Sequence, residues 1–188
     1  MQKETVKRGA LVTGRLLFLS FLVIFLSSCA GTPRAKMSEV GQIIRNVPFY
    51  PQERYYCGPA SLAGILNFWG VTVMPEEIAA EIYSRSARGT VTLDMVLYSE
   101  KRGLKATQYE GSLEDVKKKI DAGYPLIVMV DNGFWIYQKE HFMVVFGYYG
   151  NGVVVNSGKD QYEFIHLSDF LKSWERTRYW TLLITPGR

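Results

Sequence analysis

Short apolar runs separated by turn residues fill the second half of this chain, whereas helical spacing dominates the part before it. Residues 125–130 and 141–148 are continuous apolar runs with the length of buried strands. Apolar residues within 57–69 recur three and four positions apart, as they do on the buried face of a helix. Helices followed by antiparallel strands predict an α+β fold. We expect a single folded domain, because 188 residues are too few for two sizeable cores.

The predicted elements follow each other closely. We expect helices at residues 57–69, 75–83, 92–103, 112–123 and 168–174, several of them closed by glycine and with Thr92 and Ser112 as N-caps. Strands are expected at 104–109, 125–130, 141–148, 153–156, 162–165 and 179–184, with residues 85–90 as a polar loop. Asn151-Gly152 predicts the turn of a hairpin.

The N-terminal segment has the pattern of an export signal. Four basic residues precede an apolar run at residues 16–26, which is shorter than the ~20 residues that span a bilayer. Leu26-Ser27-Ser28-Cys29 resembles the lipobox of bacterial lipoproteins, which implies lipidation of Cys29. We therefore expect a signal peptide at 1–28, a lipidated cysteine and tether at 29–45, and a folded domain at 46–188. Ala30 after the cysteine favours the periplasmic face of the outer membrane.

Charge and cysteine content exclude several classes of function. The formal charge of +4 falls to +1 once the first 28 residues are removed, and no basic stripe remains, so nucleic acid is not an expected partner. Two histidines and one further cysteine lack metal-ligand spacing, and no glycine loop for phosphate is present. We expect neither a metal nor a cofactor, and no disulfide between Cys29 and Cys57.

Cys57 lies where the chain is expected to turn into a helix. The positive end of a helix dipole favours a thiolate, and the backbone N–H of Cys57 could face a developing oxyanion. Gln52, in an extended segment, could supply a second donor to that oxyanion. Gly58 leaves room for a substrate backbone, and residues 88–90 are expected at the opposite lip of the cleft. The pattern indicates a thiol nucleophile.

His141 opens the apolar strand at 141–148 and is the expected base. Asn156 on the next strand could orient its imidazole as the third member of a triad. A strict turn at Asn151-Gly152 would place Asn156 opposite Gly147, whereas a turn near residues 148–149 would place it opposite His141. The sequence leaves both registers open. It also leaves open whether residues 134–137 line the cleft or pack on the core edge.

These residues resemble a known family. Pro48-Phe49-Tyr50-Pro51-Gln52, Cys57-Gly58-Pro59-Ala60-Ser61-Leu62 and the strand from His141 to Tyr148 are similar to the motifs of C39-like peptidases, which have a papain-like fold. The resemblance extends over most of residues 46–185, and the Ser-Gly and tryptophan pattern near the end is similar to a lipoprotein subgroup. It implies Cys57 as nucleophile, His141 as general base and Gln52 as oxyanion donor.

The sequence departs from that family at the third catalytic residue. The family has an Asp-Pro pair, where this chain reads Val155-Asn156-Ser157-Gly158-Lys159-Asp160. Asn156, Ser157 and Asp160 are therefore three candidates for orienting His141, and we take Asn156 as the first choice.

The resemblance implies a cysteine peptidase anchored in the cell envelope, with a peptide or protein as substrate. Two alternatives remain open at this stage. One is an amidase or acyltransferase that uses the same cysteine and histidine. The other is an inactive peptide-binding module, for which the missing Asp-Pro pair is the only support.

Overall fold

The computed structural model describes residues 41–52, 55–134 and 136–187. The chain divides into two units, Met1–Met37 and Ser38–Arg188, and all described residues belong to the second. The predicted signal segment and Cys29 lie outside the described residues. No helix within the described ranges is both long and apolar enough to cross a membrane.

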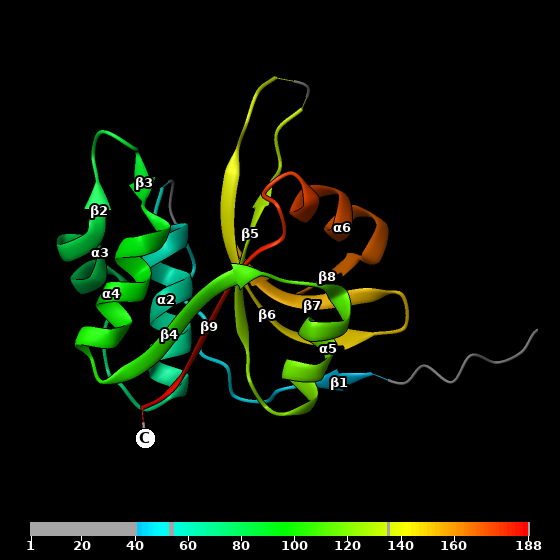
Figure 1. Ribbon diagram of the computed structural model, residues 1–188, viewed down its shortest axis with the longest axis horizontal. Coiled ribbons are helices and arrows are strands. Elements are labelled where there is room, and N and C mark those ends of the chain that lie inside the picture. Colours follow the sequence, from blue (N-terminus) through cyan, green and yellow to red (C-terminus); the bar gives the residue numbers. More distant parts are fainter. Residues whose placement is uncertain (1–40, 53–54, 135, 188) are drawn as a thin grey trace, which may run out of the picture. The chain divides into compact units, whose positions relative to one another are not determined.

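Three helices gather on one side of the domain and most of a large sheet lies on the other (Figure 1). The first group is α2 (Cys57–Phe68), α3 (Pro75–Ile82) and α4 (Thr92–Lys101). The remaining helices are α5 (Leu113–Asp121) and α6 (Leu167–Glu175). These positions confirm the helices expected from the sequence. The Ser112 hydroxyl accepts a hydrogen bond from the Asp115 N–H at 3.1 Å, as a capping residue should.

All pairings in the main sheet are antiparallel, with strand order β4-β9-β5-β6-β7-β8 and with β1 added beside β6. The strands are β1 (Gln42–Ile43), β4 (Leu104–Glu110), β5 (Leu126–Asp131), β6 (Glu140–Tyr149), β7 (Gly152–Ser157), β8 (Asp160–His166) and β9 (Trp180–Pro186). The expected α+β architecture is thereby confirmed. The sheet brings the turn between the end of β7 and the start of β8 close to the start of β6, where the Ser157 side chain contacts that of His141.

Two local expectations were wrong. The segment read as a polar loop ends in a strand, β3 (Gly89–Thr90), which pairs with β2 (Tyr83–Ser84) just before the loop; two residue pairs, Tyr83 with Thr90 and Ser84 with Gly89, form this hairpin despite its polar side chains. Thr92 is the first residue of α4 and not its cap; Val91 occupies that place, with no side-chain hydrogen bond.

Helix α2 is buried on nearly all sides, which is why its sequence is apolar around the whole helix. Every residue from Gly58 to Leu66 is buried. A Cβ at Gly64 would lie 2.9 Å from the carbonyl oxygen of Pro48, so glycine lets the extended segment at 47–52 cross the helix closely. This crossing brings Gln52 to the end of the domain where α2 begins.

The register of the β6–β7 hairpin lies between the two alternatives that the sequence left open, which placed Asn156 opposite Gly147 or opposite His141. Tyr149 pairs with Gly152, so the turn residues are Gly150 and Asn151, one position before the expected pair. A bulge between Val145 and Gly147 adds one residue to β6, so that Asn156 lies opposite Val144. Asn156 therefore faces neither Gly147 nor His141 directly.

Candidate active site

Cys57 is the first residue of α2 and lies next to the strand that carries His141. Its side chain is half-buried, and the backbone N–H groups of Phe142, Gly58 and Cys57 itself hydrogen-bond to the sulfur. Because Phe142 directly follows His141 on β6, this contact places the thiol beside the imidazole strand. The start of α2 and the start of β6 thus lie next to each other, as expected from the sequence.

The electrostatic setting of the thiol differs from the simple expectation of a stabilised thiolate. Burial raises the pKa of Cys57, the three backbone hydrogen bonds oppose this, and the carboxylate of Glu140 adds to the rise. The net effect is a pKa above the ordinary value of a thiol. The backbone donors thus do not outweigh desolvation, and the resting sulfur is protonated near neutral pH.

His141 is the second residue of β6, paired in register with Val130 of β5. Burial lowers the pKa of its imidazole to about 4, and the charge of nearby Lys139 acts in the same direction. The imidazole is therefore neutral near neutral pH and can accept a proton. The resting pair consists of a neutral thiol and a neutral imidazole, which is the starting state for general-base catalysis.

The hydrogen bond that holds His141 comes from Ser157. The distance from His141 Nε2 to Ser157 Oγ is 3.1 Å. Asn156 is buried, but its Oδ1 accepts the backbone N–H of Tyr162 at 3.2 Å. The choice of Asn156 as orienting residue is thus corrected, because neighbouring strand residues point to opposite faces of the sheet. Asp160, the third candidate, pairs with Ser157 across the turn and is exposed.

Gln52 is attached to the same turn from the other direction. Its backbone N–H donates to the carbonyl oxygen of Gly158 at 2.8 Å. The residue is only 8% exposed, and its Oε1 has no hydrogen-bond partner among the described residues. A buried amide oxygen without a partner fits a side chain that faces a ligand more than it fits a surface residue.

Gly58 is required by packing against Thr90 of β3. A Cβ at Gly58 would lie 2.7 Å from both Cβ and Oγ1 of Thr90. The space that the sequence assigned to substrate is thus filled by this side chain, while residues 89–90 do lie beside the start of α2, as expected for a lip. The buried Oγ1 of Thr90 has no partner in the described part of the chain.

A hairpin between β5 and β6 rises at the same end of the domain as β2 and β3 (Figure 1). Asp131 fixes its base: Oδ1 accepts the N–H groups of Gly133 and Lys139 at 2.8 Å each, and Oδ2 pairs with Arg176 at 2.9 Å. Phe134 is 77% exposed and Ile136 is 88% exposed. These two side chains therefore do not pack on the edge of the core, which was one of the two alternatives that the sequence left open for residues 134–137.

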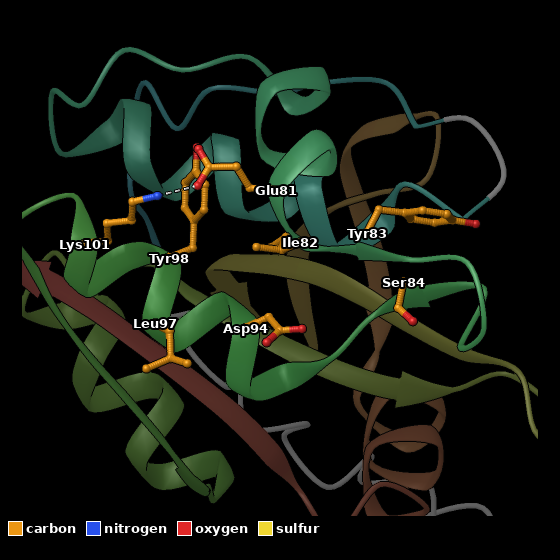
Figure 2. A pocket seen from close by; sticks show the side chains of 8 residues that line it. All are labelled: Glu81, Ile82, Tyr83, Ser84, Asp94, Leu97, Tyr98 and Lys101. Carbon is orange, nitrogen blue, oxygen red and sulfur yellow. Dashed lines mark hydrogen bonds and ion pairs between the residues drawn. The ribbon is translucent and has the colours of Figure 1, made fainter.

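A separate cavity of about 300 Å³ lies between α3, β2 and α4. Figure 2 shows the pair of Lys101 and Glu81, 2.8 Å apart, across Tyr98 at one side of this cavity. None of the expected site residues lines it. Tyr83, which lines this cavity, stacks on Tyr56, the residue before Cys57, with ring centroids 5.7 Å apart.

Sequence reasoning missed Glu163. This residue lies on β8 opposite Val155, is half-buried, and its carboxylate is hydrogen-bonded by the Ser157 side chain. Burial raises its pKa, the charge of Asp160 raises it further, and the bond from Ser157 opposes the rise. The only signal in the sequence was its place two residues before Ile165, an apolar residue of the same strand that packs against the core.

The family profile described as "Peptidase_C39 like family" matches residues 44–181. The chain belongs to the peptidase C39-like family. That membership confirms the family named from the Cys57 and His141 motifs, and its members are generally cysteine peptidases. No curated protein matches the chain significantly.

Solved structures share the fold of this C39-like protein. A C39-like peptidase from Bacillus anthracis is 19% identical, with a TM-score of 0.65 over 78% of this chain and 98% of that one. The peptidase domain of Streptococcus ComA, a bifunctional ABC transporter of a quorum-sensing pathway, is 21% identical, with a TM-score of 0.64 over 76% of this chain and 100% of that one.

A double-glycine motif protease from an AMS/PCAT transporter was solved with its leader peptide. It is 23% identical, with a TM-score of 0.60 over 79% of this chain and 100% of that one. At these identities the likeness establishes the fold, which confirms the papain-like architecture.

Proposed function

We propose that this C39-like protein is a cysteine peptidase that hydrolyses peptide bonds through a thioester on Cys57. The observation that carries the proposal is the contact between the Cys57 sulfur and the backbone N–H of Phe142, the residue after His141. This contact joins a nucleophile at a helix N-terminus to a neutral imidazole on the neighbouring strand. Both groups are half-buried, so a substrate can still reach them.

The first half of the reaction forms the acyl-enzyme. His141 takes the proton of the Cys57 thiol while the sulfur attacks the peptide carbonyl carbon, and the carbonyl electron pair moves onto its oxygen. The N–H of Cys57 and the amide of Gln52 stabilise that oxyanion. When the C–N bond breaks, the imidazolium gives its proton to the leaving amine, and a thioester remains.

The second half returns the enzyme to its resting state. His141 removes a proton from a water molecule, the hydroxide attacks the thioester carbon, and the sulfur leaves as thiolate. The imidazolium then returns a proton to the sulfur. Because burial raises the pKa of the thiol, the sulfur depends on His141 in each cycle.

Incubation with a peptide library prepared from digested bacterial envelope proteins tests this function. We expect new peptide termini with the wild-type protein, an acyl-enzyme mass adduct on Cys57, and neither with Cys57→Ala. Ser61→Ala, on the same helix, is the matched control and should cleave as the wild type does. Equal cleavage by wild type and Cys57→Ala would exclude the mechanism.

An added amine separates hydrolysis from acyl transfer. If Cys57 forms the thioester but product appears mainly as the amine adduct, the site is an acyltransferase with the same nucleophile. If peptides bind equally to the wild type and a Cys57→Ala, His141→Ala variant and are never cleaved, the protein is a binding module.

We further propose that Cys29 carries lipid and anchors the protein in the bacterial envelope, at the outer membrane. The support is the short apolar run followed by Leu26-Ser27-Ser28-Cys29. Growth with an alkyne-labelled fatty acid should label the wild type and leave Cys29→Ala unlabelled. Equal labelling of the two would contradict lipidation at this residue.

A further inference from the structure

The polar contacts of His141 continue beyond Ser157. The Ser157 hydroxyl contacts Nε2 of the imidazole at 3.1 Å and also hydrogen-bonds to the carboxylate of Glu163 on β8. Ser157 is the last residue of β7, and Glu163 pairs in register with Val155, two residues earlier on that strand. Because residues two apart in a strand share a face, Ser157 and Glu163 lie on the same side of the sheet.

The hydrogen-bonding capacity of these groups fixes which atom donates in each of the two hydrogen bonds. An ionised carboxylate only accepts hydrogen bonds, so Ser157 must use its single O–H to donate to Glu163. The Ser157 oxygen then accepts, and its partner Nε2 must carry the proton of the neutral imidazole. Nδ1 is left with a lone pair, as a base that takes the thiol proton requires.

We propose that Glu163 is a positioning residue that acts through Ser157: its carboxylate holds His141 in the tautomer with the proton on Nε2, so that Nδ1 is free to take the proton of Cys57. The proposal rests on the function proposed above. Two residues would then take the place of the missing Asp of the Asp-Pro pair: the neutral hydroxyl of Ser157 and, on the next strand, the carboxylate of Glu163.

Protonation of Glu163 reverses the direction of both hydrogen bonds. A protonated carboxyl donates to the Ser157 oxygen, the Ser157 O–H turns to Nε2, and the imidazole then carries its proton on Nδ1, where it cannot accept from the thiol. Reactivity is thus lost as the pH falls through the pKa of Glu163, which burial and Asp160 raise. The other charges near the pair are Lys139 beside His141 and Glu140 beside Cys57.

The tautomer can be measured without any substrate. The chain contains only two histidines, His141 and His166, so the ¹⁵N imidazole spectrum of the full chain is assigned by comparison with His166→Gln. We expect the Nε2–H tautomer for His141 in the wild type near neutral pH and a mixture of tautomers in Glu163→Gln. An unchanged spectrum in Glu163→Gln would overturn the proposal.

The rate of Cys57 alkylation provides the matching chemical readout, in a Cys29→Ala background where Cys57 is the only thiol. We expect Glu163→Gln to lower the rate with iodoacetamide near neutral pH roughly tenfold, because a wrong tautomer removes the base. The control is Glu110→Gln, an exposed glutamate at the end of β4 on the other edge of the sheet. It should leave the rate unchanged.

Ser157→Asp distinguishes positioning from a structural role. It places a carboxylate directly against Nε2, so adding Glu163→Gln to this background should change the alkylation rate less than about twofold. If Glu163→Gln has the same effect in both backgrounds, Glu163 does not act through Ser157 and the proposal fails. A tautomer that depends on Glu163 in a protein that cleaves no peptide would leave this proposal standing and remove the peptidase function.

Discussion

On the helix side of the site (Gln52, Cys57, Gly58 and Thr90), two buried oxygens have no hydrogen-bond partner within the described residues: Gln52 Oε1 and Thr90 Oγ1. On the strand side (His141, Ser157 and Glu163), each polar group bonds to the next one. The helix side therefore keeps polar groups unpaired where a substrate would lie. The polar groups of the strand side are paired with each other and determine which nitrogen of His141 carries the proton. Substitutions should affect the two sides differently.

The largest expected effect is on the helix side. Gln52→Ala should lower kcat for the peptide found in the library experiment by about 10²–10³-fold with little change in KM, because an oxyanion donor acts mainly in the transition state. The measurement is steady-state cleavage, with Gln161→Ala on exposed β8 as the control. A change in KM alone would show that Gln52 only binds the ground state, and no change would remove it from the site.

The strand side predicts a pH-dependent stability. Burial lowers the pKa of His141 to about 4, while an unfolded histidine has a pKa of ~6.5. Between these values the unfolded chain binds a proton that the folded chain does not, so the free energy of unfolding decreases as the pH falls through this window. The decrease due to His141 is about 3 kcal/mol at most.

Urea unfolding at a series of pH values measures this decrease in the wild type and in His141→Gln. The variant should show a shallower loss of stability between near-neutral and mildly acidic pH. Parallel curves for the two proteins would mean that the folded imidazole titrates normally.

The packing on the helix side predicts a smaller effect. Gly58→Ala should lower the free energy of unfolding by about 2 kcal/mol, because the new methyl group overlaps Thr90. In a Thr90→Gly background the same substitution should cost clearly less, since the atoms 2.7 Å away are gone. Additive costs in the double variant would show that Thr90 is not the obstacle.

The smallest effect concerns the cavity in Figure 2. Glu81→Gln removes the ion pairs to Lys101 and Arg102, which lie at the surface. We expect unchanged alkylation of Cys57 and nearly unchanged stability, as measured by iodoacetamide kinetics and urea unfolding. A loss of Cys57 reactivity would connect this cavity to the active site.

The sequence predicted where the helix-side residues lie in the fold, because the information for their positions is local. Gln52, Cys57 and Gly58 lie within seven positions of each other, and helical spacing alone places the cysteine at a helix start. The position of His141 at the start of β6 was also predictable, since it opens a continuous apolar strand.

The third member was misplaced because its position depends on register. One bulge between Val145 and Gly147 and a turn shifted by one residue decide whether Asn156 or Ser157 points to His141. Glu163 was missed because it meets the site only through the pairing of β7 with β8. The rise in the pKa of Cys57 was not foreseen, as the sequence shows the helix dipole and not the degree of burial.

The pH dependence of Cys57 alkylation in wild type and His141→Ala, both carrying Cys29→Ala, shows whether Cys57 and His141 act as a coupled nucleophile and base. Because burial raises the pKa of the thiol, we expect the reactivity of Cys57 near neutral pH to depend on His141. The wild type should react at least about tenfold faster than His141→Ala there, and the two rates should converge at alkaline pH, where the thiol ionises unaided. Equal rates across the whole pH range would contradict a coupled nucleophile and base.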